Sequence, residues 1–258
     1  MFALWGAVSK QVATGLRASG VVSLALAINL APPGARAESE APRNEFFTGF
    51  EVSDNYASAY LGGGYAFGKG LDAPGWRLRS VASYGRYRYD GTLPVGADTV
   101  AIEFDGEEYF GSALVGYQFH PGGRLIVKLF AGIESDSQII SPHDPNNSVQ
   151  GSALGLRLQA ETWADLSERY FLSADASYGT AFQQYWALAR LGYRLGERVS
   201  LGLEGGALGN EEYNAGRGGG FARVNFRAME VTLSSGFTGN YLEDDPSFYV
   251  ALGLYRPF

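Results

Sequence analysis

The sequence predicts an all-β protein: an antiparallel, transmembrane β-barrel of the outer-membrane type with about twelve strands. Three observations lead to this fold class. Beyond residue 44, apolar and polar residues alternate with a period of two, as in strands whose faces meet different surroundings. The expected connections are alternately short and long, which is the rule for outer-membrane barrels. The chain also ends in Phe258 behind alternating apolar residues, and only Arg256 and Pro257 depart from the ending typical of such barrels.

The alternation fits two kinds of β protein. The segment SALGLRLQAE (152–161) puts Leu154, Leu156 and Leu158 on one face and Arg157 on the other. A soluble sandwich or lipocalin-like barrel buries such an apolar face inside, whereas a transmembrane barrel turns it outward to lipid.

Paired tyrosines favour the transmembrane barrel. Tyr170 and Tyr178 begin and end the apolar face of one predicted strand, and Tyr185 and Tyr193 do so on the next. Eight residues extend about 26 Å along a strand. At a tilt of about 40° this is about 20 Å of height, close to the separation of the two aromatic girdles.

Twelve strands are expected, and their even number puts both chain ends at the periplasmic rim. They are predicted near residues 45–53, 57–68, 76–89, 107–120, 123–135, 149–164, 169–179, 183–195, 198–208, 220–228, 230–239 and 247–258. Long outer loops are expected at 90–106, 136–148 and 209–219, and a loop of middle length at 241–247.

The N-terminus has the composition of a secretory signal peptide. Lys10 and Arg17 precede the short apolar run 20–31, and Ala35–Ala37 forms a cleavage site of the A-x-A type. The run is too short for a membrane helix, which needs about 20 residues. We therefore expect a signal peptide (1–37), a short lead (38–44) and one barrel domain (45–258), exported to the outer membrane of a Gram-negative bacterium.

Charge and residue content exclude several function classes. The net charge is −7, and cleavage of the signal peptide would make it more negative, which argues against a nucleic-acid partner. The chain has no cysteine and two histidines, so a disulfide or a zinc site is not expected. Neither a cofactor nor a metal is expected, although acid pairs such as Glu211 and Glu212 would suit a divalent cation.

The enzymatic alternative is a hydrolase embedded in the membrane. Its candidates are His143 with Ser141 and Asp144, or His120 beside Ser112. No motif joins these residues into a triad, and His143 lies between prolines in a stretch of turn-forming residues. We therefore expect a protein that is not an enzyme.

The charged face of the strands is expected to line the lumen. The candidates are Arg86, Arg88, Lys128, Glu134, Arg157, Glu161, Asp175, Arg190, Arg194, Glu204, Arg223, Arg227 and Glu230. In YGRYRYDG (84–91), this turns Tyr87 and Tyr89 outward to the headgroup level. Because Arg77 and Arg79 have the opposite parity to Arg86, we expect either a β-bulge near residues 80–83 or a position of Arg77 below the membrane.

The chain resembles the bacterial cellulose biosynthesis protein BcsS family. The matching stretches are FTGFEVSD (47–54), YGRYRYD (84–90), VGYQFH (115–120), SPHDPNNSVQG (141–151), YWALARLGYR (185–194) and LGNEEYNAGR (208–217). The resemblance implies a barrel of the outer envelope with a role in cellulose production or export. It supplies no catalytic residues.

Together these observations predict a non-enzymatic accessory barrel of cellulose biosynthesis or secretion. Its expected partners are outer-membrane lipid, the exported glucan and other components of the cellulose synthase complex. We expect glucan contact at the outer mouth, where aromatic rings lie beside charged and amide side chains. The candidates are Arg86, Arg88, Asp90, Asp144, Asn146, Asn147, Trp186, Glu211, Tyr213 and Arg217. The alternative is a porin-like or structural barrel without glucan specificity.

Overall fold

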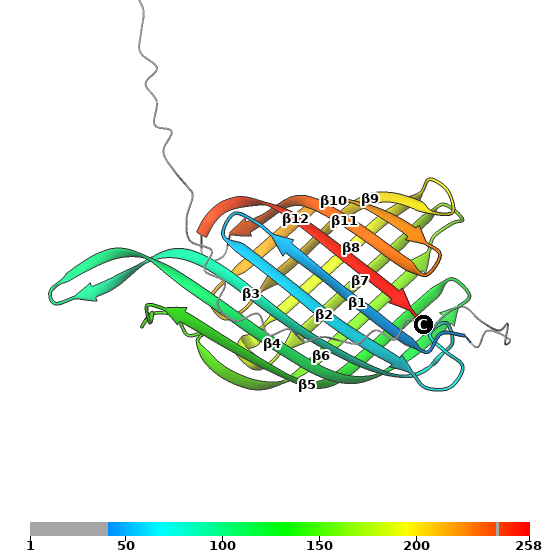
Figure 1. The fold of residues 1–258 in the computed structure, drawn as a ribbon, viewed down its shortest axis with the longest axis horizontal. Helices are drawn as coiled ribbons and strands as arrows, with labels where there is room; N and C mark the ends of the chain where they lie inside the picture. Colours follow the sequence, from blue (N-terminus) through cyan, green and yellow to red (C-terminus); the bar gives the residue numbers. More distant parts are fainter. Residues whose placement is uncertain (1–40, 241–242) are drawn as a thin grey trace, which may run out of the picture. The chain divides into compact units, whose positions relative to one another are not determined.

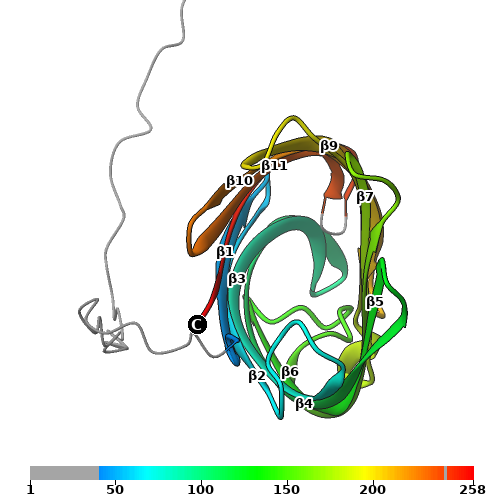
Figure 2. The same cartoon turned by 90° about the vertical axis from the view of Figure 1, so that its right-hand side faces the viewer.

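The computed structural model describes residues 41–240 and 243–258, shown in Figure 1. The expected signal peptide lies outside these residues. Twelve strands form a closed antiparallel barrel in chain order, and β1 pairs with β12 to close it. The strands surround the lumen in Figure 2. Within the described residues, no helix is long and apolar enough to cross a bilayer.

The strands are separated mainly by short connections. A short 3-10 helix, η1 (Ala181–Gln183), precedes β8. The bounds of the strands are β1 Asn44–Val52, β2 Tyr56–Ala66, β3 Gly75–Val95, β4 Asp98–Gly122, β5 Leu125–Ser141, β6 Gly151–Asp165, β7 Tyr170–Gly179, β8 Tyr185–Arg194, β9 Val199–Gly209, β10 Asn214–Phe226, β11 Met229–Asn240 and β12 Glu243–Pro257. All twelve predicted strands are therefore present.

The third and fourth strands are much longer than predicted. Residues 90–106, expected as a loop, form the ends of β3 and β4 around a tight turn. The ladder to β2 reaches Tyr87 and the ladder to β5 begins at Asp105, so the segment between them projects as a two-stranded hairpin (Figure 1, cyan to green). Outside a bilayer both faces of a strand can be polar, so the alternation that marks a membrane strand is lost there.

Two other predicted loops are also shorter than expected. β5 extends to Ser141 and β10 begins at Asn214, which takes residues from the expected loops 136–148 and 209–219. What remains of these two predicted loops is the loop 142–150 and the four-residue connection 210–213 after β9.

The outer wall carries the apolar face. Leu154, Leu156 and Leu158 on β6 are 86%, 65% and 60% exposed. A water-soluble protein does not present a continuous apolar belt of this kind, whereas a lipid-facing barrel requires one. The soluble alternative therefore does not describe this chain.

Aromatic rings border this belt toward both rims. Tyr170 packs against Tyr193 with ring centroids 5.0 Å apart, near the rim with the chain ends. Tyr178, at the other end of β7, is 46% exposed on the outer wall. Tyr170 and Tyr178 therefore lie at the two ends of the outward face of β7, as predicted.

Candidate functional site

A cavity of about 640 Å³ lies in the lumen, a size typical of small-ligand sites. Its walls come from the inward residues of the strands, which are mostly polar or charged. The register confirms the inward orientation of Lys128, Glu134, Arg157, Glu161, Asp175, Arg190, Arg194, Glu204, Arg223 and Glu230. Arg227 instead lies exposed in the turn between β10 and β11.

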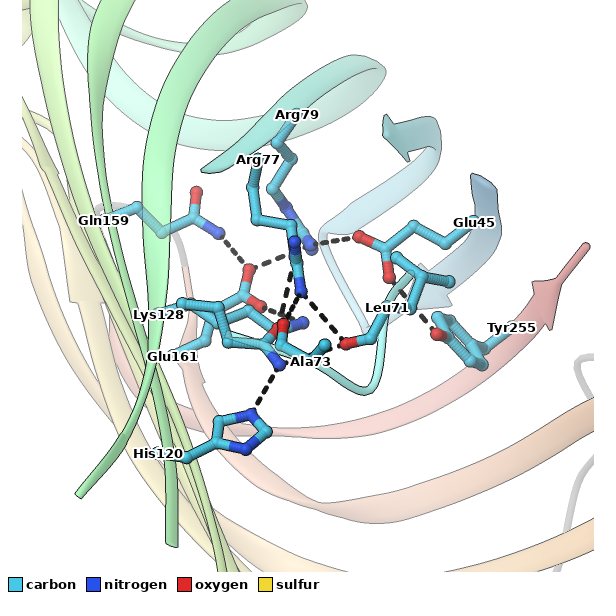
Figure 3. A network of polar contacts seen from close by, with 11 residues as sticks. Glu45, Leu71, Ala73, Arg77, Arg79, His120, Lys128, Gln159, Glu161 and Tyr255 are labelled. Atoms are coloured by element: carbon cyan, nitrogen blue, oxygen red, sulfur yellow. Dashed lines mark hydrogen bonds and ion pairs between the residues drawn. The ribbon is translucent and has the colours of Figure 1, made fainter. Parts of the chain in front are cut away.

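One ion-pair network spans the lumen near the rim with the chain ends (Figure 3). Arg79 Nη1 on β3 lies 3.3 Å from Glu45 Oε1 on β1 and 2.9 Å from Glu161 Oε1 on β6. Lys128 Nζ lies 3.3 Å from the other oxygen of Glu161, and the Tyr255 hydroxyl donates to Glu45. Strands far apart along the sheet are thus joined through the lumen.

A second network centres on Glu204, whose side chain is fully buried. Arg190 Nε lies 2.8 Å from one carboxylate oxygen, and the Ser234 and Tyr249 hydroxyls donate at 2.8 and 2.6 Å. Arg217 stacks over the Tyr249 ring at 4.0 Å. These hydrogen bonds satisfy a carboxylate whose burial would otherwise be unfavourable.

Aromatic rings fill the lumen between this second network and the rim with the chain ends. Trp163 stacks on Phe171 with centroids 4.6 Å apart. The Arg223 guanidinium lies over both rings at 5.4 and 5.3 Å and forms an ion pair with Glu230 at 3.2 Å. Arg194 pairs with Asp165 beside them. Cation–π contact and stacking make this a closely packed layer.

The charges that line the cavity are balanced. Of the described residues, six basic and six acidic side chains line it. Each basic one is held in an ion pair. Within the same set, Glu108 and Asp175 are the acids outside any ion pair. Glu108 accepts a hydrogen bond from Gln184 at 2.9 Å, while Asp175 forms no hydrogen bond with another described residue.

The loop 142–150 folds over one side of the outer mouth. The Tyr89 hydroxyl donates to Asp144 Oδ2 at 2.8 Å, and Asn147 Nδ2 donates to Tyr89 at 3.1 Å. Val149 is fully buried. Ser148 donates from its backbone N–H, at 2.7 Å, and from its hydroxyl to Glu212 in the connection after β9. The loop therefore reaches across the rim from β5 to β9.

Three of the residues expected to contact glucan share the cavity. Trp186, Tyr213 and Arg217 all line it. Asp144 and Asn147 are buried in the tethered loop, and Asn146 and Glu211 are exposed at the rim. The predicted outer-mouth residues thus divide into a lumen group and a rim group.

The predicted orientation of the β3 arginines is wrong. Arg86 and Arg88 point outward, with side chains 63% and 58% exposed beside Glu107 and Glu103, and Asp90 shares this exposed face. Tyr87 and Tyr89 point inward and are 3% and 4% exposed. Their rings join Phe104 and Ile140 in a buried cluster. Near the outer rim, the outward face carries charges and the inward face carries aromatic rings.

The predicted bulge is also wrong. β3 pairs with β4 from Gly75 to Val95 without a register shift. A regular strand puts Arg77 and Arg79 inward and Arg86 and Arg88 outward, so all four arginines need not share a face. Arg77 lies inside the barrel, 3% exposed.

The two histidines lie at opposite ends of the barrel. His120 lies near the end of β4, at the rim with the chain ends, where its Nε2 is 2.8 Å from Gln118 Nε2. His143 lies exposed in the outer loop. The Asp144 carboxylate accepts hydrogen bonds from the Tyr89 hydroxyl and from the Asn146 backbone N–H. This carboxylate therefore does not orient the His143 ring.

Several cavity residues were not predicted from the sequence. Glu45, Glu51, Tyr60, Arg79 and Glu108 all line the lumen. The available signal was whether a residue has an odd or even position along its strand, because alternate residues share a face. It was weak on β1 and β2, where glycines and aromatic residues occupy both faces.

Comparisons with solved structures found several similar proteins of low sequence identity. The chain is similar to the KdgM porin in complex with disordered oligogalacturonate (11% identity, 83% of this chain and 99% of that chain, TM-score 0.49) and to the CymD monoaromatic hydrocarbon channel (8%, 84% and 89%, 0.48). It is also similar to LpxR from Salmonella typhimurium (11%, 83% and 100%, 0.48). No curated protein matches the chain.

A family model gives a more specific result than these barrels. The model described as cellulose biosynthesis protein BcsS matches residues 46–258. The match covers every strand of the barrel, from the third residue of β1 to the residue after β12. The chain therefore belongs to the cellulose biosynthesis protein BcsS family.

Proposed function

We propose that this protein is a non-enzymatic accessory of cellulose biosynthesis or secretion, resident in the bacterial outer membrane, whose outer end contacts the exported glucan. Its apolar belt contacts membrane lipid, and its rims are available to other components of the cellulose synthase complex. Family membership supports the link to cellulose.

The observation that carries glucan contact is the grouping of Trp186, Tyr213 and Arg217 in one cavity wall. Aromatic faces stack on sugar rings, and neighbouring polar groups bond the hydroxyls. Asn146 and Glu211 are exposed above this wall. Arg88 and Asp90 on the projecting hairpin, with Arg86 next to its base, form a second polar surface on the same side of the membrane.

Retention on cellulose tests this proposal. Detergent-purified wild-type protein should bind microcrystalline cellulose, and Trp186→Ala and Tyr213→Ala should weaken retention. Trp76→Ala is the matched control, because Trp76 is 57% exposed on the lipid-facing wall against Tyr117. Equal retention of wild type and both cavity variants would remove glucan contact from the proposal.

A porin-like function is the alternative, and the cavity of about 640 Å³ is the observation that favours it. A porin would be retained no better on cellulose than an unrelated barrel.

Membrane fractionation on a density gradient tests the outer-membrane location, with a heat-dependent gel shift to report the folded barrel.

A further inference from the structure

We infer that the lumen is a blind cup that opens at the outer rim and binds a short segment of neutral glucan through Asp175 and Glu108, without letting the chain pass. This inference rests on the proposed function and names the site and the ligand class. It follows from what closes the lumen and from the charges left in its cavity.

We call the end of the lumen near the rim with the chain ends its lower end. The connection between β2 and β3 closes one side of this lower end. Arg77 Nη2 donates to the carbonyls of Gly70 and Leu71 at 3.1 and 3.2 Å and also to that of Ala73. Gln118, which is 1% exposed, donates to the same Leu71 carbonyl at 3.0 Å. Figure 3 shows this connection below Arg79. A segment held by so many buried donors blocks part of the lower lumen.

The packed layer of Trp163, Phe171 and Arg223 fills the other side. Phe171 is 1% exposed, and a Cβ on Gly192 of the neighbouring strand β8 would overlap its ring. The ring therefore lies over β8 and extends toward Phe221 on β10, with ring centroids 6.3 Å apart. Among the described residues, the cavity lining excludes Trp163 and Phe171 and also Arg77 and Gln118. Arg223, the third member of the packed layer, lines the cavity, so the cavity ends at these two layers. Twelve strands enclose a narrower lumen than open porins do, so side chains suffice to close it.

The cavity reaches the outer rim on the side that the loop 142–150 leaves uncovered. Its lining there includes Asn55, Asn210, Tyr213 and Gly239. These residues belong to the connection after β1, the connection after β9 and the upper end of β11. A ligand would thus enter from outside the cell.

The charge arrangement selects a neutral ligand. Every basic side chain of the lining is already paired with an acid, so none is available for a carboxylated sugar. Asp175 and Glu108 remain as carboxylates outside ion pairs. An ionised carboxylate is an acceptor with several lone pairs, and sugar hydroxyls are donors that would satisfy it.

Aromatic rings complete the site. Trp186 lines the same cavity, two pairs along from Asp175 in the β7–β8 ladder. Tyr60 extends over Gly49, where an added Cβ would meet its ring. Rings on both sides of the cavity offer flat apolar faces for pyranose stacking.

Binding of cellotetraose to the purified protein tests the ligand class. Isothermal titration should show binding of cellotetraose and none of a galacturonate tetramer. Asp175→Asn and Glu108→Gln should each weaken binding by about tenfold or more, because hydrogen bonds to a charged acceptor are lost. Glu103→Gln, on the outward face of the hairpin, should leave binding unchanged. Wild-type affinity in either carboxamide variant, or equal binding of the charged tetramer, overturns the inference.

Conductance in planar bilayers tests the closed end. Wild-type protein should show no steady ion current, and Arg77→Ala should produce openings because the connection between β2 and β3 loses its donor. A steady wild-type current would overturn the blind cup while leaving glucan contact intact. If neither cellulose retention nor cellotetraose binding occurs, the proposed function fails as well. Retention on cellulose without cellotetraose binding would overturn the cup alone.

Discussion

The Arg79 guanidinium on β3 lies 2.9 Å from the Glu161 carboxylate on β6, with two strands between them in the sheet. The two side chains are only 16% and 12% exposed. The same guanidinium reaches Glu45 on β1 and stacks over Phe47 at 4.3 Å. One side chain thus braces three parts of the wall.

Removing this charge should destabilise the barrel. In Arg79→Met, Glu161 keeps only Lys128 as a cationic partner, and Glu45 loses its own. Breaking a largely buried pair by removing one member costs about 3 kcal/mol of unfolding free energy. Urea unfolding followed by the gel shift measures this loss. The control is Arg88→Met, whose partner Glu103 is 58% exposed, and it should change stability by less than about 1 kcal/mol. Equal effects of the two variants would contradict the bracing role.

Two glycines on β4 should respond in opposite ways to an added methyl group. A Cβ on Gly106 would overlap the inward ring of Tyr87, whereas one on Gly111 would meet nothing. We expect Gly106→Ala to lower stability by about 1–3 kcal/mol through overpacking. Gly111→Ala should be neutral or slightly stabilising because alanine loses less backbone entropy in a strand. Thermal unfolding of both variants decides this, and a similar loss in both would argue against the packing of Tyr87 beneath the outer loop.

The period of two predicted the barrel and its strand order, because lipid on one side and the lumen on the other impose it wherever a strand crosses the membrane. It misassigned Arg86 and Arg88 because these residues lie near the rim, where the outward face no longer meets lipid. Tyr87 and Tyr89 show the same effect from the other side: their rings are buried against β4 and β5, where Tyr87 donates to Gln138 and Tyr89 contacts the loop 142–150.

The polar networks could not be predicted from local pattern. Arg79 meets Glu161, and Arg217 meets Glu51, only because the sheet closes and brings distant strands across a narrow lumen. Inward parity shows that these side chains enter the lumen, but their partners depend on tilt and closure. The same holds for Asp175, which parity placed inside without showing that it lacks an ion pair.

The lipid-facing wall gives a third prediction. Ala189 lies midway between Tyr185 and Tyr193 on β8 and is exposed on the outer wall. Ala189→Arg should lower stability by about 2–4 kcal/mol, which is the effect of arginine near the midplane of a bilayer. Ala101→Arg introduces the same change on the exposed face of the hairpin and should have an effect below about 1 kcal/mol. Unfolding in lipid vesicles measures both, and equal effects would mean that the belt does not face lipid.

The tether between Ser148 and Glu212 gives the last prediction. Two donors of Ser148 converge on one oxygen of Glu212, while Tyr89 holds the base of the same loop. Removing the carboxylate in Glu212→Ala leaves that base in place but frees the far side of the loop. Local opening should then increase about tenfold or more, because hydrogen bonds to a charged group are lost.

A cysteine at the buried position Val149 reports this opening, since the natural chain has no cysteine to interfere. Maleimide should label Val149→Cys slowly in the parent protein and faster when Glu212→Ala is added. Glu211→Ala is the matched control, because the neighbouring carboxylate accepts from Gln183 in the connection before β8. Equal labelling rates in the two double variants would mean that Glu212 does not hold the loop, and that Tyr89 and its partners alone keep it over the mouth.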